Sequence, residues 1–248
     1  MIFSRIIIDD LSLLSLIKGF NNKSENLLIT YFNQHCFNIY NTNRRYGELI
    51  EDHFHIYLDG IGIYWAMKVL EFRYVKKINA SDLNTRIIEY FIETKKKVFI
   101  IGGNFSKIQI LKAIKRGLTV ISYKNGFFKN NEISDLISDI VNKNPDIIII
   151  GMGVPRQELF AIKLNEYING KTIICVGNFI EFYLGTLNRS PKLLRNIGME
   201  WSYRIYTEPR RLWKRYIFGI PIFMKSILLL KIKANYKSFY CKGRTDEK

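Results

Sequence analysis

Four consecutive isoleucines, residues 147–150, constrain the fold more than any other stretch of the chain. They belong to the segment DIIIIGMGVPRQELF, residues 146–160. A strand that is apolar at every position suits the interior of a parallel sheet, where both faces are covered. Gly151 and Gly153 then allow a tight turn, and Pro155 is well placed to open a helix. The segment therefore predicts a strand–turn–helix unit that delivers polar residues where open α/β sheets bind ligands.

Similar apolar runs recur along the chain and predict further strands. In chain order the predicted strands are RIIID, NLLITY, HIYLDG, KVFIIGG, LTVISY, DIIIIG and KTIICVG. Helical patterns such as SKIQILKAIKR and ISDLISDIVNK separate the later ones. Strands that alternate with helices of about ten to fifteen residues imply crossover connections and a parallel sheet. We therefore predict an α/β fold, with a parallel sheet flanked by helices over residues 1–188 and a basic helical appendage over residues 189–248.

The positive charge is concentrated in the predicted appendage. The net charge is +16, and residues 191–248 hold 14 Lys and Arg against four Asp and Glu, whereas residues 1–190 hold 24 against 18. A basic surface can serve nucleic acid, anionic lipid or a phosphorylated substrate. Residues 216–237, YIFGIPIFMKSILLLKIKANYK, are too interrupted to span a bilayer. They predict either a helix lying in the headgroup region of an anionic membrane or helices packed on the core with their lysines toward water.

Cysteine and histidine are too sparse to indicate a disulfide framework or a metal centre. Cys36, Cys175 and Cys241 are odd in number and widely spaced, which predicts reduced thiols in a cytosolic setting. The opening MIFSRIIIDD does not form a secretory signal, because two acids directly follow a very short apolar run. His53 and His55 alternate on a predicted strand, a spacing compatible with a metal. No third ligand is evident, so a surface or packing role is favoured.

Three predicted strand ends carry glycine. They lie in LDGIG (58–62), IIGGN (100–104) and IGMGVPRQE (150–158). The carboxyl ends of parallel strands share one edge, where helix N-termini receive anions and phosphate in particular. None of the three matches a dinucleotide or Walker fingerprint, and one such loop alone would be ordinary turn chemistry. Together they indicate a nucleotide or phosphorylated ligand, with contacts expected at Gly60, Gly62, Gly102, Gly103, Gly151 and Gly153.

Asp59 is the acid whose position is most informative. It ends a short apolar strand and precedes a glycine, so its carboxylate can stand free at the sheet edge. The alternative is an Asp-Gly turn that a hydrogen bond of the Asp59 side chain stabilises. Arg156, Gln157 and Glu158 are either ligand contacts or ordinary residues of a first helical turn. The chain has no Asp-x-Asp pair to hold a metal-bound diphosphate. Arginine and lysine would therefore neutralise any diphosphate.

Five blocks of the sequence resemble the WecG/TagA/CpsF glycosyltransferases, glycosyltransferase family 26. The blocks occur in the order DGIGIYWA (59–66), SDL (81–83), VFIIGG (98–103), GMGVPRQE (151–158) and GNFIEFYLGTLNRSPKLLRNIGMEWSYRIYTEPRRLWKRY (177–216). The resemblance covers the chain from about Leu27 to Gly219. It implies a Rossmann-like core and an inverting transfer of a sugar from a UDP-sugar to an undecaprenyl-diphosphate-linked saccharide. The sugar would be N-acetylmannosamine, N-acetylmannosaminuronate or a related hexose.

The resemblance also implies a setting for the reaction. The products would be teichoic acid, enterobacterial common antigen or capsule. The protein would be cytoplasmic and peripherally attached to the inner face of the cell membrane, where the basic appendage closes the site against anionic lipid. No metal or other cofactor and no nucleic acid is expected, and self-association is left open.

Carried over residue by residue, the resemblance assigns roles to single positions. Asp59 would be the general base that takes a proton from the acceptor hydroxyl. Asn33 would lie in an early pocket loop, and Gln157 with Arg156 in a ligand-contacting loop. Lys77 precedes the Ser-Asp-Leu element and Asp82 belongs to it, near the same pocket. The residues expected to stabilise charge on the leaving diphosphate are Arg204, Arg211 and Arg215.

Three positions depart from the pattern of the family. Tyr31 replaces a common threonine, Lys77 a common arginine and Ala80 a glycine. All three touch the expected sugar or diphosphate pocket, so they leave the identity of the donor open. Two other functions also stay open: a nucleotide-dependent oxidoreductase, which NAD(P) would protect from unfolding, and a non-enzymatic basic protein that binds RNA or membrane with a steep dependence on salt.

Overall fold

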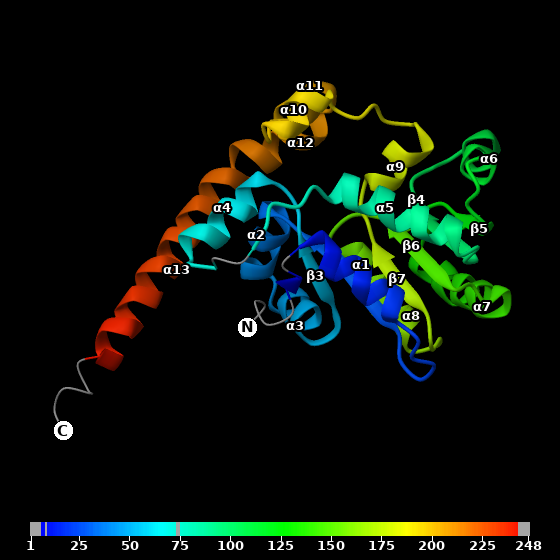
Figure 1. Ribbon diagram of the computed structural model, residues 1–248, viewed down its shortest axis with the longest axis horizontal. Coiled ribbons are helices and arrows are strands. Elements are labelled where there is room, and N and C mark those ends of the chain that lie inside the picture. Colours follow the sequence, from blue (N-terminus) through cyan, green and yellow to red (C-terminus); the bar gives the residue numbers. More distant parts are fainter. Residues whose placement is uncertain (1–5, 8, 73–74, 243–248) are drawn as a thin grey trace.

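A seven-stranded, all-parallel sheet forms the centre of the computed structural model, which describes residues 6–7, 9–72 and 75–242 (Figure 1). The strands are β1 (Ile6–Ile7), β2 (Leu27–Phe32), β3 (His55–Leu58), β4 (Val98–Gly102), β5 (Val120–Lys124), β6 (Ile147–Gly151) and β7 (Thr172–Cys175). Their order in the sheet is β1-β3-β2-β7-β6-β4-β5. All seven predicted strands and the α/β fold are confirmed. The first five residues, which bear on the secretory signal, and the side chain of Cys241 lie outside the described part.

Helices connect the strands and continue after the last one. Those of the sheet region are α1 (Asp10–Gly19), α2 (Gln34–Thr42), α3 (Arg44–His53), α4 (Ile61–Val69), α5 (Ala80–Glu93), α6 (Lys107–Lys115), α7 (Ile133–Lys143), α8 (Arg156–Asn165) and α9 (Phe179–Leu184). A short 3-10 turn, η2 (Asn130–Glu132), precedes α7. Those of the appendage are α10 (Lys192–Asn196), α11 (Glu200–Thr207), α12 (Pro209–Ile217) and α13 (Gly219–Lys242).

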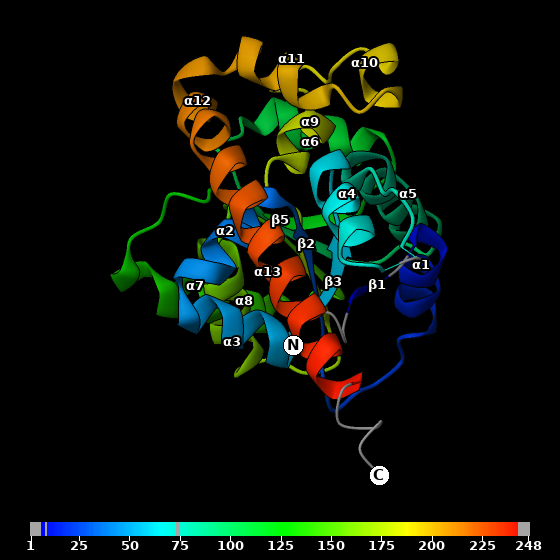
Figure 2. The ribbon, with the colours of Figure 1, turned by 90° about the vertical axis from the view of Figure 1, so that its left-hand side faces the viewer.

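The sheet lies between two layers of helices, and its strands are apolar on both faces (Figure 2). Ile148 and Ile150 pack on one side against α2, α3, α4, α7 and α8. Ile147 and Ile149 pack on the other side against α1, α5, α6 and α9. All four side chains are buried. This alternation explains why the run of isoleucines needs no polar position: side chains of successive residues point to opposite faces, and both faces are covered.

Asparagine side chains begin two of the helices at the carboxyl edge of the sheet. Asn33 follows β2, and its side-chain oxygen accepts hydrogen bonds from the amides two and three residues later, which begins α2. Asn79 begins α5 with the same two bonds. Asparagine is favoured at this position because it satisfies amides that have no partner inside the helix. The two caps therefore fix where the chain turns at this edge.

The basic appendage is helical, as predicted, and packs against the sheet region. Helices α10 to α12 lie at the carboxyl end of the sheet, and α13 runs back along α2 and α4 (Figure 1). Phe223 and Ile227 of α13 are buried in the same cluster as Phe37, whose ring centroid is 5.2 Å from that of Phe223. Asn38 adds a hydrogen bond of 2.7 Å to the carbonyl of Gly219. One side of α13 thus belongs to the core, while the proposed boundary at residue 188 stays a prediction.

The other side of α13 leaves apolar residues exposed between lysines. Leu228, Leu229 and Ile232 are exposed, and so are Ile217, the last residue of α12, and Phe218, which follows it. No helix within the described residues is long and apolar enough to cross a membrane. The packed and the membrane-facing interpretations of this segment are therefore compatible, because each concerns a different side of the same helix.

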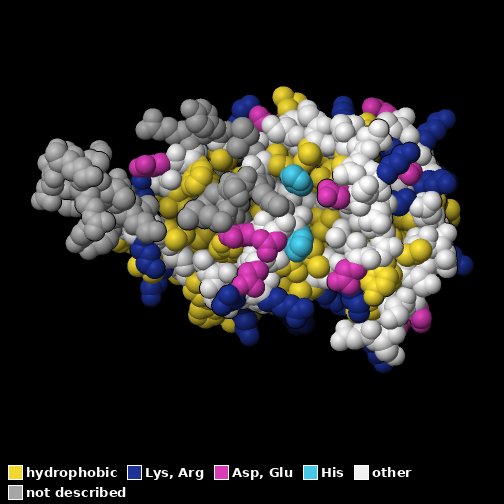
Figure 3. Space-filling model, turned by 90° about the horizontal axis from the view of Figure 1, so that it is seen from below, with side chains coloured by type: hydrophobic (Ala, Val, Ile, Leu, Met, Phe, Trp, Pro, Cys, Tyr) yellow, Lys and Arg dark blue, Asp and Glu magenta, His cyan; other side chains and the backbone are white. Residues whose placement is uncertain are grey.

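The predicted alternation of His53 and His55 on one strand is wrong. His53 is the last residue of α3, Phe54 caps that helix, and only His55 belongs to β3. The helix continues through the polar Glu-Asp-His end because its buried face is set earlier, by Tyr46 and Ile50. Both histidines line a polar hollow at the amino end of the sheet, the face shown in Figure 3. Among the described residues, no three His, Cys, Asp or Glu are placed to hold a metal ion.

Candidate functional site

A cavity of about 420 Å³ opens at the carboxyl ends of β2 and β3, beneath the appendage. Its volume is within the range of roughly 300–1,000 Å³ that is typical of small-molecule sites. A recess of about 40 Å³ continues from it toward β7. The residues that line both spaces are Asn33, Asp59, Ser81, Arg204 and Arg215. Parts of the chain that are far apart in sequence therefore meet at one place.

Asp59 lies at the centre of this arrangement. Its backbone amide donates to the carbonyl of Phe32 at 2.9 Å, which continues the pairing of β3 with β2 for one more residue. Its Oδ1 accepts from the amide of Ala80 at 3.2 Å, so the carboxylate is held by the start of α5. The following Gly60 has φ of 92°, a backbone conformation that suits glycine and turns the chain into α4. The carboxylate thus faces the cavity, as the first interpretation of Asp59 predicts.

Burial and a second carboxylate make Asp59 more basic. Burial raises the pKa of Asp59 above its usual value, and the negative charge of Glu200 raises it further. The Ala80 amide and the charges of Arg204 and Arg215 act in the opposite direction and lower that pKa. The net effect is a higher pKa than that of an exposed aspartate. A carboxylate in this position is suited to accept a proton.

Arg204 and Arg215 bring positive charge to the same cavity from α11 and α12. Both are half-buried, and the guanidinium of Arg204 lies over the ring of Phe182, 5.5 Å from its centroid. The Nε atoms of both arginines are buried and have no hydrogen-bond partner among the described residues. Buried donors without a partner are costly, and an anion in the cavity would supply the missing acceptors.

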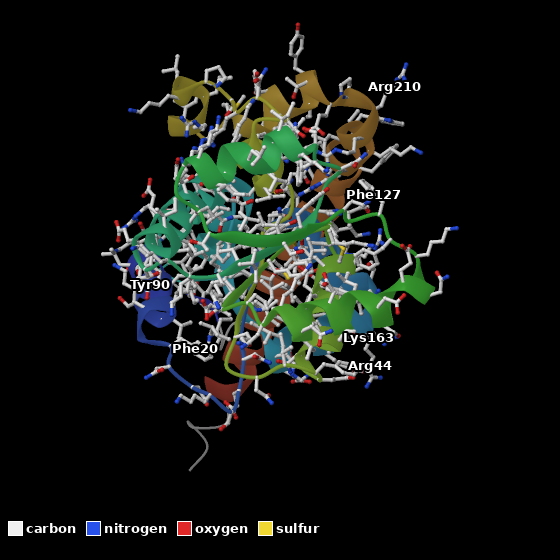
Figure 4. All side chains as sticks on the ribbon, turned by 90° about the vertical axis from the view of Figure 1, so that its right-hand side faces the viewer. Phe20, Arg44, Tyr90, Phe127, Lys163 and Arg210 are labelled. Atoms are coloured by element: carbon white, nitrogen blue, oxygen red, sulfur yellow. The ribbon has the colours of Figure 1, made fainter. Side chains whose placement is uncertain are left out.

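The third predicted arginine, Arg211, does not reach the cavity. It is exposed and pairs with Glu208, with an Nη2–Oε2 distance of 2.6 Å. Its neighbour Arg210 extends away from the body of the molecule (Figure 4). The pair with Glu208 at spacing i,i+3 holds Arg211 at the start of α12, near Glu181 of α9 and away from the cavity lining.

Asp82 also lies outside the cavity lining, in a position that joins two parts of the chain. Its carboxylate accepts from Arg189 at 2.6 Å and from Arg195 at 3.1 Å. Both arginines come from the start of the appendage, and Asp82 from the first turn of α5. The structure thus gives Asp82 a contact with the appendage rather than a place on the cavity wall.

Several predicted residues do line the cavity. Gly60, Gly62, Lys77 and Asn33 are among its walls. Two of the residues that depart from the pattern of the family, Tyr31 and Ala80, line the smaller recess instead. The hydroxyl of Tyr31 would be 2.7 Å from a Cβ placed at Gly177, so its ring lies against the turn after β7.

The glycines at the ends of β4 and β6 are not part of the cavity. A Cβ at Gly102 would be 2.5 Å from the carbonyl oxygen of Gly151, and one at Gly151 would be 2.7 Å from that of Gly177. A Cβ at Gly103 would meet the ring of Phe105, and Gly153 has open space around it. The strand ends of this half therefore use glycine for close backbone contact, which is a different requirement from access to a ligand.

Gln157 and Glu158 are inside the protein and do not line the cavity. Both are 0% exposed. Thr30 and the Gln157 amide donate to the same Glu158 oxygen at 2.7 Å each, and the amide of Gly177 donates to Gln157 Oε1 at 3.1 Å. Burial raises the pKa of Glu158 to about 7, against the lowering effect of these hydrogen bonds. The first turn of α8 thus lies against β2 and β7. Its Gln157 side chain holds the turn after β7 by accepting a hydrogen bond from Gly177.

Arg156, the first residue of that turn, is exposed and faces another loop. Its Nη2 donates to the carbonyl of Phe128 at 2.7 Å, and its guanidinium lies over the Phe128 ring, 5.1 Å from the centroid. It is absent from the lining of both spaces around Asp59. The structure therefore does not bring Arg156, Gln157 and Glu158 to the cavity, and their predicted contacts with a ligand stay predictions.

Other residues at the cavity were missed by sequence reasoning. Glu200 lines it and accepts from the side chain of Asn79 at 3.1 Å. His35 does not line it but lies near Arg215, and burial followed by that positive charge lowers the pKa of His35 to about 4. Asn79 precedes Ala-Ser-Asp-Leu, which is a recognisable start of a helix. Glu200 gives no such signal, because it reaches the cavity only when the appendage folds over the sheet.

Comparison with known proteins identifies a family of glycosyltransferases. The model of the glycosyl transferase WecG/TagA/CpsF family matches residues 3–237. A relative from Bacillus spizizenii is 27% identical over 191 residues, which are 75% of this chain and 72% of the relative. A relative from Staphylococcus aureus is 27% identical over 215 residues, 86% of this chain and 84% of the relative. Both relatives are named N-acetylglucosaminyldiphosphoundecaprenol N-acetyl-beta-D-mannosaminyltransferase.

Proposed function

The chain belongs to the WecG/TagA/CpsF family of glycosyltransferases, and on that premise we propose that it transfers a hexose from a UDP-sugar, with inversion, to an undecaprenyl-diphosphate-linked saccharide. One observation carries the proposal. The carboxylate of Asp59 lines the same cavity as Arg204 and Arg215, whose buried Nε atoms have no hydrogen-bond partner in the part of the chain that the structure describes. A base and a cationic clamp in one cavity are what such a transfer requires.

Each residue has a defined part in the proposed reaction. Asp59 takes the proton from the acceptor hydroxyl as that oxygen attacks the anomeric carbon of the donor. The bond between this carbon and the UDP oxygen breaks on the opposite face, and its electron pair leaves with UDP. Arg204 and Arg215 stabilise the charge that develops on the diphosphate. A single base in line with the leaving group is sufficient for inversion.

The names of the relatives support N-acetylmannosamine as the sugar and N-acetylglucosaminyl diphosphoundecaprenol as the acceptor. N-acetylmannosaminuronate and related hexoses stay as alternatives, since Tyr31 and Ala80 shape the recess beside Asp59 and Lys77 lines the main cavity. The resulting polymer would be a teichoic acid, a capsule or a related surface polysaccharide. The family match gives no support to the oxidoreductase or to the RNA-binding alternative.

A peripheral position on the inner face of the cell membrane is also part of the proposal. The exposed apolar residues of α12 and α13 alternate with basic ones, an arrangement that suits the headgroup region of anionic lipid. We further propose that no metal ion takes part in the transfer. Its support is that two arginines can neutralise a diphosphate without a metal-binding acid pair.

The direct test is an assay of UDP release across a panel of UDP-sugars, with a short prenyl-diphosphate–N-acetylglucosamine as acceptor. We expect release that depends on acceptor, is highest with UDP-N-acetylmannosamine and is unchanged by EDTA. Absence of transfer with every donor would refute the proposed function, provided that the protein is folded. A strict requirement for Mg²⁺ or Mn²⁺ would refute the metal-independent clamp alone.

A further inference from the structure

The cavity has two chemically different ends. The polar end contains Asp59 with Arg195, Arg204 and Arg215, all described above. The other end lies between α4 and α13 and is apolar. Its walls are Ile61, Trp65, Ala66 and Val69 of α4, and Ile220, Phe223, Met224 and Ile227 of α13. We call this second end the α4–α13 trough.

The trough is built from one stripe of each helix. Ile61, Trp65 and Val69 follow each other at intervals of four residues, which places them on the same side of α4. On α13, Phe223 and Ile227 are 3% and 5% exposed and belong to the core, so they form a fixed floor. The rim is open, since Trp65, Val69 and Met224 are 60%, 48% and 61% exposed. The trough is therefore a preformed apolar groove with a buried floor and an exposed rim.

We propose that the α4–α13 trough binds the first isoprene units of the acceptor lipid, next to its diphosphate. The inference rests on the proposed function and assigns the hydrocarbon part of that substrate to a site. An occupant suited to this site combines a hydrocarbon chain with an anionic head, because the apolar walls belong to the same cavity as three arginines. A peptide segment is a poor fit, since its backbone amides would find no hydrogen-bond partners along side chains of this type.

Such a site would fix the position of the acceptor as well as its affinity. A chain held between α4 and α13 directs its diphosphate toward the arginines and the attached sugar toward Asp59. Binding of the chain restricts the motion of the acceptor before the reaction begins. Less entropy is then lost when the acceptor hydroxyl reaches the reactive geometry. The exposed apolar residues farther along α13 would then contact the membrane from which the chain emerges.

The first experiment locates the lipid without requiring turnover. The full chain is irradiated with a benzophenone analogue of farnesyl diphosphate, and the cross-linked peptides are mapped. We expect labelling of residues 61–69 and 220–227, reduced by unlabelled geranylgeranyl diphosphate. Labelling confined to the outer face of α12 and α13 would overturn the proposal and leave only adsorption of lipid to the surface.

The second experiment uses a matched pair of variants on α13. Met224 lines the trough, whereas Ile222 is 52% exposed on the same helix and does not line it. With the wild type, we expect the acceptor KM to fall by about tenfold or more between geranyl- and geranylgeranyl-diphosphate-N-acetylglucosamine. Met224→Glu should remove most of this dependence on chain length, and Ile222→Glu should retain it, although both add the same charge to the helix.

The outcomes separate this inference from the function on which it rests. Equal dependence on chain length in both variants would refute the trough, while transfer to the geranyl acceptor would still support the glycosyltransferase. If no acceptor is used by the wild type, the proposed function fails. In that case the map of cross-links still decides whether a prenyl diphosphate binds between α4 and α13.

Discussion

The two halves of the carboxyl edge of the sheet use the same residue type for opposite purposes. Beyond β3, Gly60 has no atom within 4 Å of the place where a Cβ would stand, and the chain opens onto the cavity. At β4 and β6, the backbones of Gly102 and Gly151 are in contact and close the edge. Gly102 and Gly151 are the last residues of apolar parallel strands, and Gly60 comes two residues after another. A glycine at the carboxyl end of a parallel strand therefore indicates either access for a ligand or contact between two backbones. How closely the neighbouring strand end approaches determines which of the two applies.

The same contrast separates two carboxylates. Burial raises the pKa of both Asp59 and Glu158. Asp59 lines the cavity, whereas Glu158 is fully buried and accepts hydrogen bonds from Thr30 and Gln157. A shifted pKa alone thus does not distinguish a catalytic acid from a structural one, and exposure to the cavity must be considered with it. The predictions below test this division of the edge into an open and a closed half.

The largest effect is expected for Asp59→Asn in the open half. The variant keeps the size of the side chain but removes the base, so kcat should fall by roughly a hundredfold to ten-thousandfold with little change in UDP affinity. Steady-state kinetics and UDP titration measure the two quantities. Glu158→Gln is the matched change in the closed half, and its kcat should stay within about fivefold of the wild type. Equal losses of kcat in both variants would abolish the distinction between the two halves.

The glycines themselves provide a second comparison. Gly102→Ala places a Cβ against the Gly151 carbonyl at positive φ and should lower the free energy of unfolding by about 3 kcal/mol or more. At Gly60 a Cβ has open space, so Gly60→Ala should lower the free energy of unfolding only through its unfavourable backbone conformation, by about 1–2 kcal/mol. Denaturant titration measures both values. A larger loss at Gly60 than at Gly102 would show that the closed half is less tightly packed than the structure indicates.

The buried Glu158 should also make stability depend on pH. Its pKa is raised to about 7 in the folded protein, against 4.5 as the reference value, so the folded state holds a proton that the unfolded state has lost between these values. Stability from this group is therefore complete below pH 4.5 and falls as the pH rises toward 7. Relative to Glu158→Gln, the wild type should lose about 3 kcal/mol of stability across this interval. Unfolding curves at several pH values measure the difference, and parallel curves for the two proteins would contradict it.

The smallest expected effect concerns Glu200, the acid that the appendage adds to the open half. Its charge raises the pKa of Asp59, so Glu200→Gln should lower that pKa. Because transfer needs ionised Asp59, the acid limb of the profile of kcat/KM against pH should move to lower pH. Glu208→Gln is a suitable control, since Glu208 pairs with Arg211 outside the cavity. A shift of equal size in the control would mean that general charge, rather than proximity to Asp59, sets the pKa.

The sequence was sufficient to predict the strands because buried parallel strands are almost uniformly apolar. Residues 147–150 are the clearest example, and their burial on both faces follows directly from their composition. Asp59 was also predictable, since it stands immediately after such a strand, whereas Asn33 was expected from the resemblance to the family alone. The residues of the α8 turn were not predictable. Whether Gln157 and Glu158 face a ligand or the interior depends on how α8 packs against β2 and β7. The local sequence pattern does not predict this packing.

The contribution of the appendage was the least accessible to sequence reasoning. Arg204 and Arg215 were predicted from resemblance, but Arg211 looks the same in the sequence and is held outside the cavity by Glu208. Glu200 reaches the cavity only through the contact of α11 with the sheet region, and Trp65 of α4 lines a cavity only because α13 packs beside that helix. Such positions are set by tertiary packing between distant segments, which periodicity within one segment does not predict.

The burial of Phe223 and Ile227 has a consequence for how the active protein is made. Ribosomes complete these two residues after all seven strands and after every helix against which they pack. A polypeptide that ends before Phe223 contains α4 but not the side of α13 that faces it. The apolar side of α2, including Phe37, would then be exposed to solvent. The α4–α13 trough therefore forms only after synthesis has passed residue 227, and a shorter fragment lacks one of its two walls.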